Sequence, residues 1–167
     1  MAAVNPESLS RWYDACGAQL RLYARQWLGG AEAQDVVQEV FIRLMTQPTE
    51  PQNVKAWLFR AVRNTAISQL RRRKRRQKYT EQLALEQPGW FEPRPGDLID
   101  AETAQKVLQT LPSEQRELVV LRIWGQMTLK EVAQITDQPI STVFSRYQAA
   151  LEAIKKKMET SCKTKKN

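Results

Sequence analysis

The chain has 167 residues, a formal net charge of +8 and 42% hydrophobic residues, which suits one ordinary domain or two small ones with buried cores. It has no histidine, and its two cysteines, Cys16 and Cys162, lie far apart, which excludes histidine-based catalysis and gives no zinc or disulfide pattern. Without a signal-peptide pattern or an apolar run near the roughly 20 residues of a bilayer span, we expect a cytoplasmic protein that does not insert directly into a membrane. Cys16 is expected in a core.

Charge is segregated along the chain. Residues 1–50 carry −2, residues 51–78 carry +10, residues 79–104 carry −5, residues 105–154 are neutral and residues 155–167 carry +5. Like charges gathered in one block repel each other unless a polyanion or an opposed patch relieves them. The block 51–78 therefore predicts a nucleic-acid partner.

Helical periodicity dominates the first 78 residues. Apolar residues from Leu9 to Trp27, in steps of three and four, predict a helix that ends at the glycine pair 29–30. A second helix is predicted from about Ala31 to Met45, and a third from about Asn53 into the arginine cluster. No strand pattern occurs in the sequence.

Residues 79–104 are acidic and contain prolines and glycines that break helices, which favours a flexible linker. Within it, the aromatic pair Trp90-Phe91 could dock on a partner or pack on a neighbouring domain. The helical pattern returns from Ala101, and we place a second domain at 105–160, followed by a basic tail at 161–167.

The most specific local pattern is in this second domain. Thr128 and Glu131 form a capping box at the start of a helix, and the turn after that helix contains Asp137, which tolerates a left-handed conformation. A new helix is predicted near Ser141, and the spacing of Ala133, Asp137 and Val143 is that of a helix-turn-helix.

An ordinary pair of antiparallel helices has the same spacing, but the polar groups expected on the second helix favour DNA binding. These are Ser141, Thr142, Ser145, Arg146 and Gln148. The predicted fold is therefore all-α, with two small helical domains (1–78 and 105–160) joined by a flexible acidic, proline-containing linker (79–104), the C-terminal one a helix-turn-helix.

Three segments resemble bacterial RNA polymerase sigma factors of the extracytoplasmic-function (ECF) type, in the sigma-70 family. Ala33–Leu44 is similar to the D-x-x-Q-E-x-F segment of that family, and Val54–Arg76 to its A-W-L-x-R-x-A-x-N segment with trailing arginines. Leu111–Arg146 resembles its C-terminal helix-turn-helix. The three matches occur in the family's order and separation.

The resemblance implies that the second helix binds core RNA polymerase. Asp35, Gln38 and Glu39 stand at i, i+3 and i+4, so they share one helix face, and Met45 flanks them. A solvated helix face is the alternative, whereas a nuclease metal pair of Asp35 and Glu39 lacks a third carboxylate in register.

The third helix is implied to melt and capture the minus-ten promoter element. Its cations suit a phosphate backbone, and its aromatic and amide side chains suit unstacked bases. The candidate residues are Trp57, Arg60, Arg63, Asn64, Ser68, Arg71 and Arg72. Trp57 also fits a core position, and Asn64 is the better candidate for base contact.

The C-terminal helix is implied to bind the minus-thirty-five element as duplex. Its candidate residues are Ser141, Thr142, Phe144, Ser145, Arg146 and Gln148. The sequence departs from the family pattern at Asp137, usually a small residue, and at Phe144, commonly an arginine. Because a phenylalanine contacts a thymine methyl but cannot bind guanine bidentately, we expect an atypical upstream sequence or weaker affinity.

The resulting hypothesis is a noncatalytic subunit that binds core RNA polymerase, recognises single-stranded minus-ten and duplex minus-thirty-five elements, and directs initiation at a specialised regulon. It needs no cofactor and no metal, and an anti-sigma factor is a further candidate partner. The alternative is a stand-alone helix-turn-helix regulator, which gives no reason for the patch of Asp35, Gln38 and Glu39.

Overall fold

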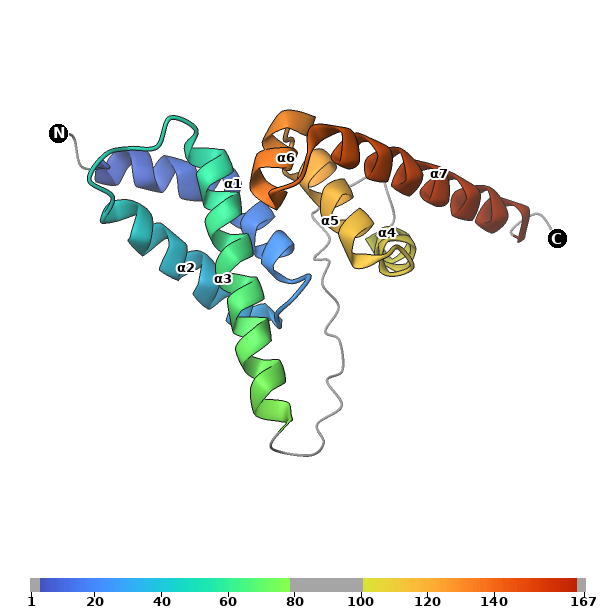
Figure 1. Ribbon diagram of the computed structural model, residues 1–167, viewed down its shortest axis with the longest axis horizontal. Coiled ribbons are helices and arrows are strands. Elements are labelled where there is room, and N and C mark those ends of the chain that lie inside the picture. Colours follow the sequence, from blue (N-terminus) through green and yellow to red (C-terminus); the bar gives the residue numbers. More distant parts are fainter. Residues whose placement is uncertain (1–3, 79–100, 165–167) are drawn as a thin grey trace. The chain divides into compact units, whose positions relative to one another are not determined.

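The computed structural model describes residues 4–78 and 101–164, with side chains described from 105 to 160 in the second range. All regular elements in these ranges are helices, and they divide into two compact units, α1 to α3 and α4 to α7 (Figure 1). The predicted all-α class with two helical domains is confirmed. Residues 79–100, with Trp90 and Phe91, lie outside the described residues, as does the side chain of Cys162.

The first unit consists of α1 (Pro6–Ala24), α2 (Gly30–Met45) and α3 (Val54–Gln77), which pack pairwise against one another. Each helix contributes one apolar stripe to a common core, in which Leu20, Leu44 and Leu58 are fully buried. The rings of Tyr23 and Phe59 meet at the centre, with their centroids 5.4 Å apart. The unit is thus a three-helix bundle with one buried core.

The first helix ends earlier than its periodicity predicted. α1 stops at Ala24 because the Gln26 and Trp27 amides donate to the carbonyls of Tyr23 and Ala24 in a tighter turn, over 3.3 and 3.1 Å. Trp27 still packs on Tyr23, with ring centroids 5.1 Å apart, so the apolar pattern outlasts the helix. The glycine pair does not end α1; Gly29 caps the start of α2 instead.

Cys16 lies in the core of this unit, as expected. Its side chain is 1% exposed, and its thiol donates to the Trp12 carbonyl over 3.0 Å. Burial raises the pKa of this thiol to about 11, an effect that nearby Lys55 partly opposes. The thiol is therefore protonated at physiological pH and serves as a small core group.

The second unit contains α4 (Ala101–Gln109), α5 (Ser113–Val119), the π-helical turn η1 (Val120–Trp124), α6 (Leu129–Thr136) and α7 (Ile140–Thr164). α4 thus begins inside the range 79–104, and α7 continues into the range 161–167. The core includes the fully buried Leu118, Leu121, Val132 and Val143.

Arginine side chains hold the loops of the second unit. The Arg116 guanidinium donates to the carbonyls of Leu108 and Leu111 over 3.1 and 3.2 Å, and its burial lowers its pKa. Arg122 donates to the Met127 carbonyl and lies 5.6 Å from the centre of the Tyr147 ring. The loop before α6 is thereby fixed to α7.

The helix-turn-helix forms as predicted. The Thr128 hydroxyl accepts from the Glu131 amide over 3.2 Å, and the Glu131 carboxylate accepts from the Thr128 amide over 2.7 Å. Asp137 adopts the left-handed conformation, with φ 55° and ψ 48°. Val143 is fully buried at the crossing of α6 and α7.

Gly125 follows the π-helical turn, at a position where any side chain would collide with the backbone. Its amide donates to the Val120 carbonyl over 2.9 Å, and a Cβ at this position would lie 2.5 Å from the Leu121 carbonyl oxygen. Gly125→Ala should therefore destabilise the second unit by about 1–3 kcal/mol, measured as a lower midpoint in urea unfolding followed by circular dichroism.

Gly30→Ala is the matched control, because a Cβ at Gly30 has no neighbour within 4 Å and alanine favours a helix. It should unfold at the wild-type midpoint or above it. An unchanged midpoint for Gly125→Ala would contradict the tight packing at η1.

Candidate nucleic-acid interface

The outer face of α2 brings together the polar residues predicted there. Asp35, Gln38 and Glu39 are all exposed, and Met45, 48% exposed, lies one to two turns further along. The opposite face of the helix is buried against α1 and α3. It consists of Ala33, Val36, Val37, Val40, Phe41 and Leu44.

Ile42 belongs to the same outer face, and the sequence analysis missed it. Its side chain is 60% exposed, the highest fraction among the large hydrophobic residues in the described ranges. It follows Gln38 by four residues and Glu39 by three, so it borders the polar patch on the same face, between Glu39 and Met45. Its position outside the apolar stripe of α2 was visible in the sequence and could have identified it. Exposed apolar groups beside polar ones are typical of a protein-binding surface.

α3 is held against α2 at two places. The Arg43 guanidinium of α2 donates to the Thr65 hydroxyl over 3.1 Å, and Arg73 of α3 pairs with Glu32 of α2 over 3.1 Å. Glu32 also accepts from the Gly29 amide over 3.1 Å, so it links the start of α2 to the far part of α3. These contacts fix the register between the two helices.

The outward face of α3 carries four of the predicted nucleic-acid residues. Arg60, Asn64, Ser68 and Arg71 are exposed, and their spacing in steps of four and three places them on one side of the helix. This side is opposite the buried stripe that includes Leu58. A continuous strip of cations and polar groups results.

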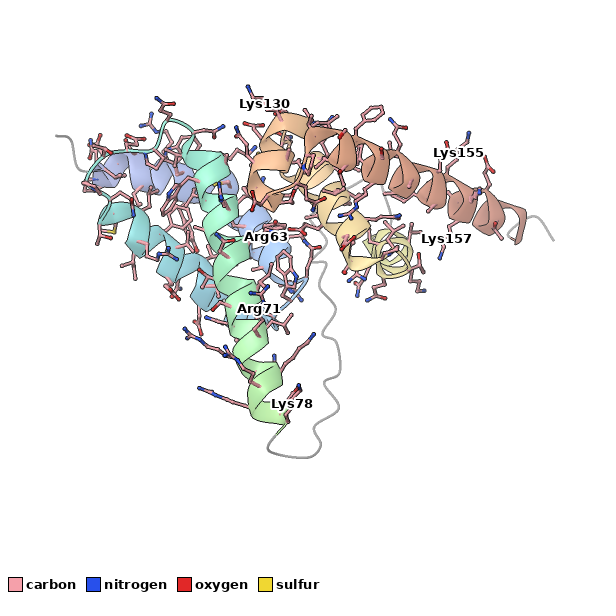
Figure 2. All side chains as sticks on the ribbon, viewed as in Figure 1. Arg63, Arg71, Lys78, Lys130, Lys155 and Lys157 are labelled. Carbon is pink, nitrogen blue, oxygen red and sulfur yellow. The ribbon has the colours of Figure 1, made fainter. Side chains whose placement is uncertain are left out.

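The other three predicted residues of α3 lie beside this strip. Trp57 is half-buried at its start, and half-buried Arg63 flanks it. Arg72 lies on the same side of α3 as the buried Ala61, but it is exposed. The reason is that α3 extends past α1 and α2 at this point (Figure 1). Figure 2 shows Arg71 and Lys78 along this extension.

The extension of α3 is densely cationic. Besides Arg71 and Arg72 it exposes Lys74, Arg75, Arg76 and Lys78. Arg73, which lies among them, forms an ion pair with Glu32 of α2. Because like charges at this density repel, the segment favours a polyanion as its partner.

The start of α7 exposes most of the residues predicted to contact duplex DNA. Ser141, Phe144, Ser145 and Gln148 are exposed, while Thr142 is half-buried. The Ser145 hydroxyl donates to the Ser141 carbonyl over 3.0 Å. Four of the six predicted residues thus share one face of this helix.

Arg146 is directed differently from the other predicted residues of α7. Its guanidinium donates to the Gln138 side chain over 2.9 Å and pairs with Glu114 over 3.3 Å. Both partners belong to the same unit, so this arginine links α7 to α5 and to the turn before α7. Arg146 is thus a half-buried residue with partners in its own unit, whereas the sequence predicts an exposed donor.

Two family models match the chain, and together they span most of both units. Sigma-70 region 2 matches residues 12–76, within α1 to α3, and the ECF-type model of Sigma-70, region 4 matches residues 101–154, within α4 to α7. The RNA polymerase sigma-H factor of Pseudomonas aeruginosa is 32% identical over 146 residues, which cover 77% of this chain and 74% of that protein.

The chain belongs to the ECF-type sigma factors of the sigma-70 family.

Further relatives agree with this assignment. The ECF RNA polymerase sigma-E factor of Escherichia coli is 29% identical over 149 residues, covering 80% of this chain and 78% of the relative. The solved structure of the sigma factor RpoE in complex with the anti-sigma factor NepR from Bartonella quintana has the same fold, with a TM-score of 0.74 at 24% identity, over 90% of this chain and 96% of that one.

As a sigma factor, the protein binds core RNA polymerase and promoter DNA and recognises promoters for transcription initiation. The family consists of initiation factors rather than enzymes. A stand-alone helix-turn-helix regulator is not favoured, because the first unit matches a sigma region as well as the second. Within the described ranges, no helix combines the length and apolarity that a membrane span requires.

Proposed function

We propose that three exposed helix faces divide the work of this sigma factor. The outer face of α2, with Asp35, Gln38, Glu39, Ile42 and Met45, docks on core polymerase. The outward strip of α3 captures the minus-ten element as single strand, and the start of α7 binds the minus-thirty-five element as duplex. The first two tasks fall to residues 1–78 and the third to 105–160. Residues 79–104 serve as the linker, whose last four residues already belong to α4, and 161–167 as the basic tail, into which α7 continues.

The observation that carries this proposal is that each of the three proposed helix faces lies opposite the buried apolar stripe of its own helix. On α2, the stripe that includes Val36 and Val40 is fully buried, so the polar patch beside Ile42 faces outward. The two carboxylates of the patch complement a cationic partner surface, and Ile42 supplies apolar area that a partner can cover. Such a surface suits a protein better than it suits DNA, whose phosphates the carboxylates repel.

Removal of the two carboxylates tests the role of α2. The double variant Asp35→Ala with Glu39→Ala should bind core polymerase about tenfold more weakly or worse, because buried interfacial charge pairs are lost. The measurement is the affinity of labelled sigma factor for purified core polymerase in the absence of DNA.

Asp14→Ala with Glu50→Ala is the control, since it removes the same two residue types from exposed positions outside α2. This control should bind core polymerase as the wild type does. Equal affinity of both double variants would place the polymerase contact elsewhere.

On α3, the arginines and Asn64 have different tasks. Guanidinium groups hold phosphates without regard to sequence, whereas an amide side chain can bond the edge of an unstacked base. Exposed Asn64 lies between Arg60 and Arg71 on the same side of the helix. A single strand laid along this strip would present its backbone to the arginines and its bases to Asn64.

The pairing of Arg73 with Glu32 gives a sharp comparison within α3. Arg71→Ala should weaken binding of holoenzyme to a single-stranded minus-ten oligonucleotide and reduce the slope of log affinity against log salt by about 0.7, the share of one phosphate contact. Arg73→Ala should change the slope less, because Glu32 already engages that guanidinium. Equal slopes for the two variants would refute the assigned strip.

The proposed partners also indicate where the protein acts and how it is regulated. The protein acts in the cytoplasm, where polymerase and promoter DNA are found, and serves a specialised regulon. An anti-sigma factor is a further proposed partner. Two solved structures of the same fold support it, because RpoE is in complex with the anti-sigma factor NepR and CnrH with the cytosolic domain of CnrY.

A further inference from the structure

An exposed apolar pair stands at the start of α7. Ile140 is 53% exposed and Phe144 is 51% exposed, and their spacing of four residues places them side by side on the first two turns. Exposed Ser141, Ser145 and Gln148 adjoin the pair. In a helix-turn-helix, the first turns of the second helix lie against the base edges of the major groove.

The one basic side chain of the same stretch is already engaged within the unit. Between positions 140 and 148 the sequence contains one basic residue, Arg146, and its guanidinium is engaged by Gln138 at 2.9 Å and by Glu114 at 3.3 Å. The usual contact to guanine is a bidentate one from arginine or lysine. At these turns the large side chains that α7 exposes most are therefore the apolar Ile140 and Phe144, while Arg146 has partners within the unit.

The major groove offers one apolar group to such a surface. It is the 5-methyl group of thymine, which phenylalanine and aliphatic side chains can cover. Gln148, one turn after Phe144 and exposed, has the amide that bonds adenine bidentately. The two kinds of side chain on one face together suit A·T pairs.

We propose that Ile140 and Phe144 bind thymine methyl groups in the upstream duplex and that this contact sets the sequence preference of α7. The proposal rests on the function proposed above for α7 and adds the chemical group that it recognises. Covering one methyl group contributes about a fourfold gain in affinity.

Deoxyuridine provides the test, because it differs from thymidine only in lacking the methyl group. Holoenzyme is bound to a promoter fragment that it transcribes, and each upstream thymine is replaced singly by deoxyuridine. Wild type should lose about fourfold in affinity at one or two positions. Phe144→Ala should bind more weakly and respond to the same replacements much less.

Two controls separate the contact from general damage. Phe144→Leu keeps an apolar side chain and should retain part of the discrimination between thymine and uracil. Ile123→Ala removes another exposed apolar side chain of the same unit, 49% exposed and outside α7, and should retain all of it.

Equal wild-type affinity for thymine and uracil at every upstream position would overturn the proposal. So would a Phe144→Ala variant that initiates poorly but discriminates as the wild type does, since the side chain would then contact a protein. Nuclease footprinting tests the underlying function separately, with Ser141→Glu and Ser145→Glu introduced together to repel phosphates. If the upstream duplex is still protected in this variant, the proposed binding of α7 to that duplex is rejected. If protection is lost but wild type binds thymine and uracil equally, only the methyl contact is rejected.

Discussion

The burial of one apolar stripe on each of α1, α2 and α3 is the constraint on which the first unit depends. Tyr23, Leu44 and Phe59 are fully buried in this core. Each large side chain buried in this way contributes about 1.5–3 kcal/mol to stability. A helix that buries one face must present the opposite one. The polar patch of α2 and the cationic strip of α3 are therefore consequences of the same packing that stabilises the bundle.

Polar contacts between the helices accompany the core packing that sets how these two surfaces lie relative to each other. The bonds from Arg43 to Thr65 and from Arg73 to Glu32 join α2 and α3 at separate points along their lengths. Exposed pairs of this kind add little stability, about 0–1 kcal/mol each. They add to the register that the core sets, because sliding α3 along α2 would break both as well as the core packing. One unit thus carries both the face proposed to bind polymerase and the face proposed to bind DNA.

Much of this arrangement was predictable from the sequence, because helices in small domains reveal their buried face through apolar periodicity. The stripes of α2 and α3, the capping box at Thr128 and the left-handed turn at Asp137 all follow from local patterns. The end of α1 did not, because Trp27 continues the apolar pattern through a turn. The engagement of Arg146 by Glu114 joins residues distant in sequence, so no local pattern announces it. Ile42 differs again, because its place outside the buried stripe is readable from the sequence, while the polar residues beside it give the stronger pattern.

The central claim is that outward faces on α2, α3 and α7 meet different partners in one initiation complex, and photo-crosslinking tests it most directly. A photoreactive amino acid is placed in turn at Ile42, Asn64 and Phe144, and the crosslinked partner is identified in a transcribing complex. Position 42 should react with core polymerase, position 64 with single-stranded promoter DNA and position 144 with the upstream duplex. Crosslinks from position 42 to DNA, or from position 64 to polymerase alone, would contradict this division of surfaces.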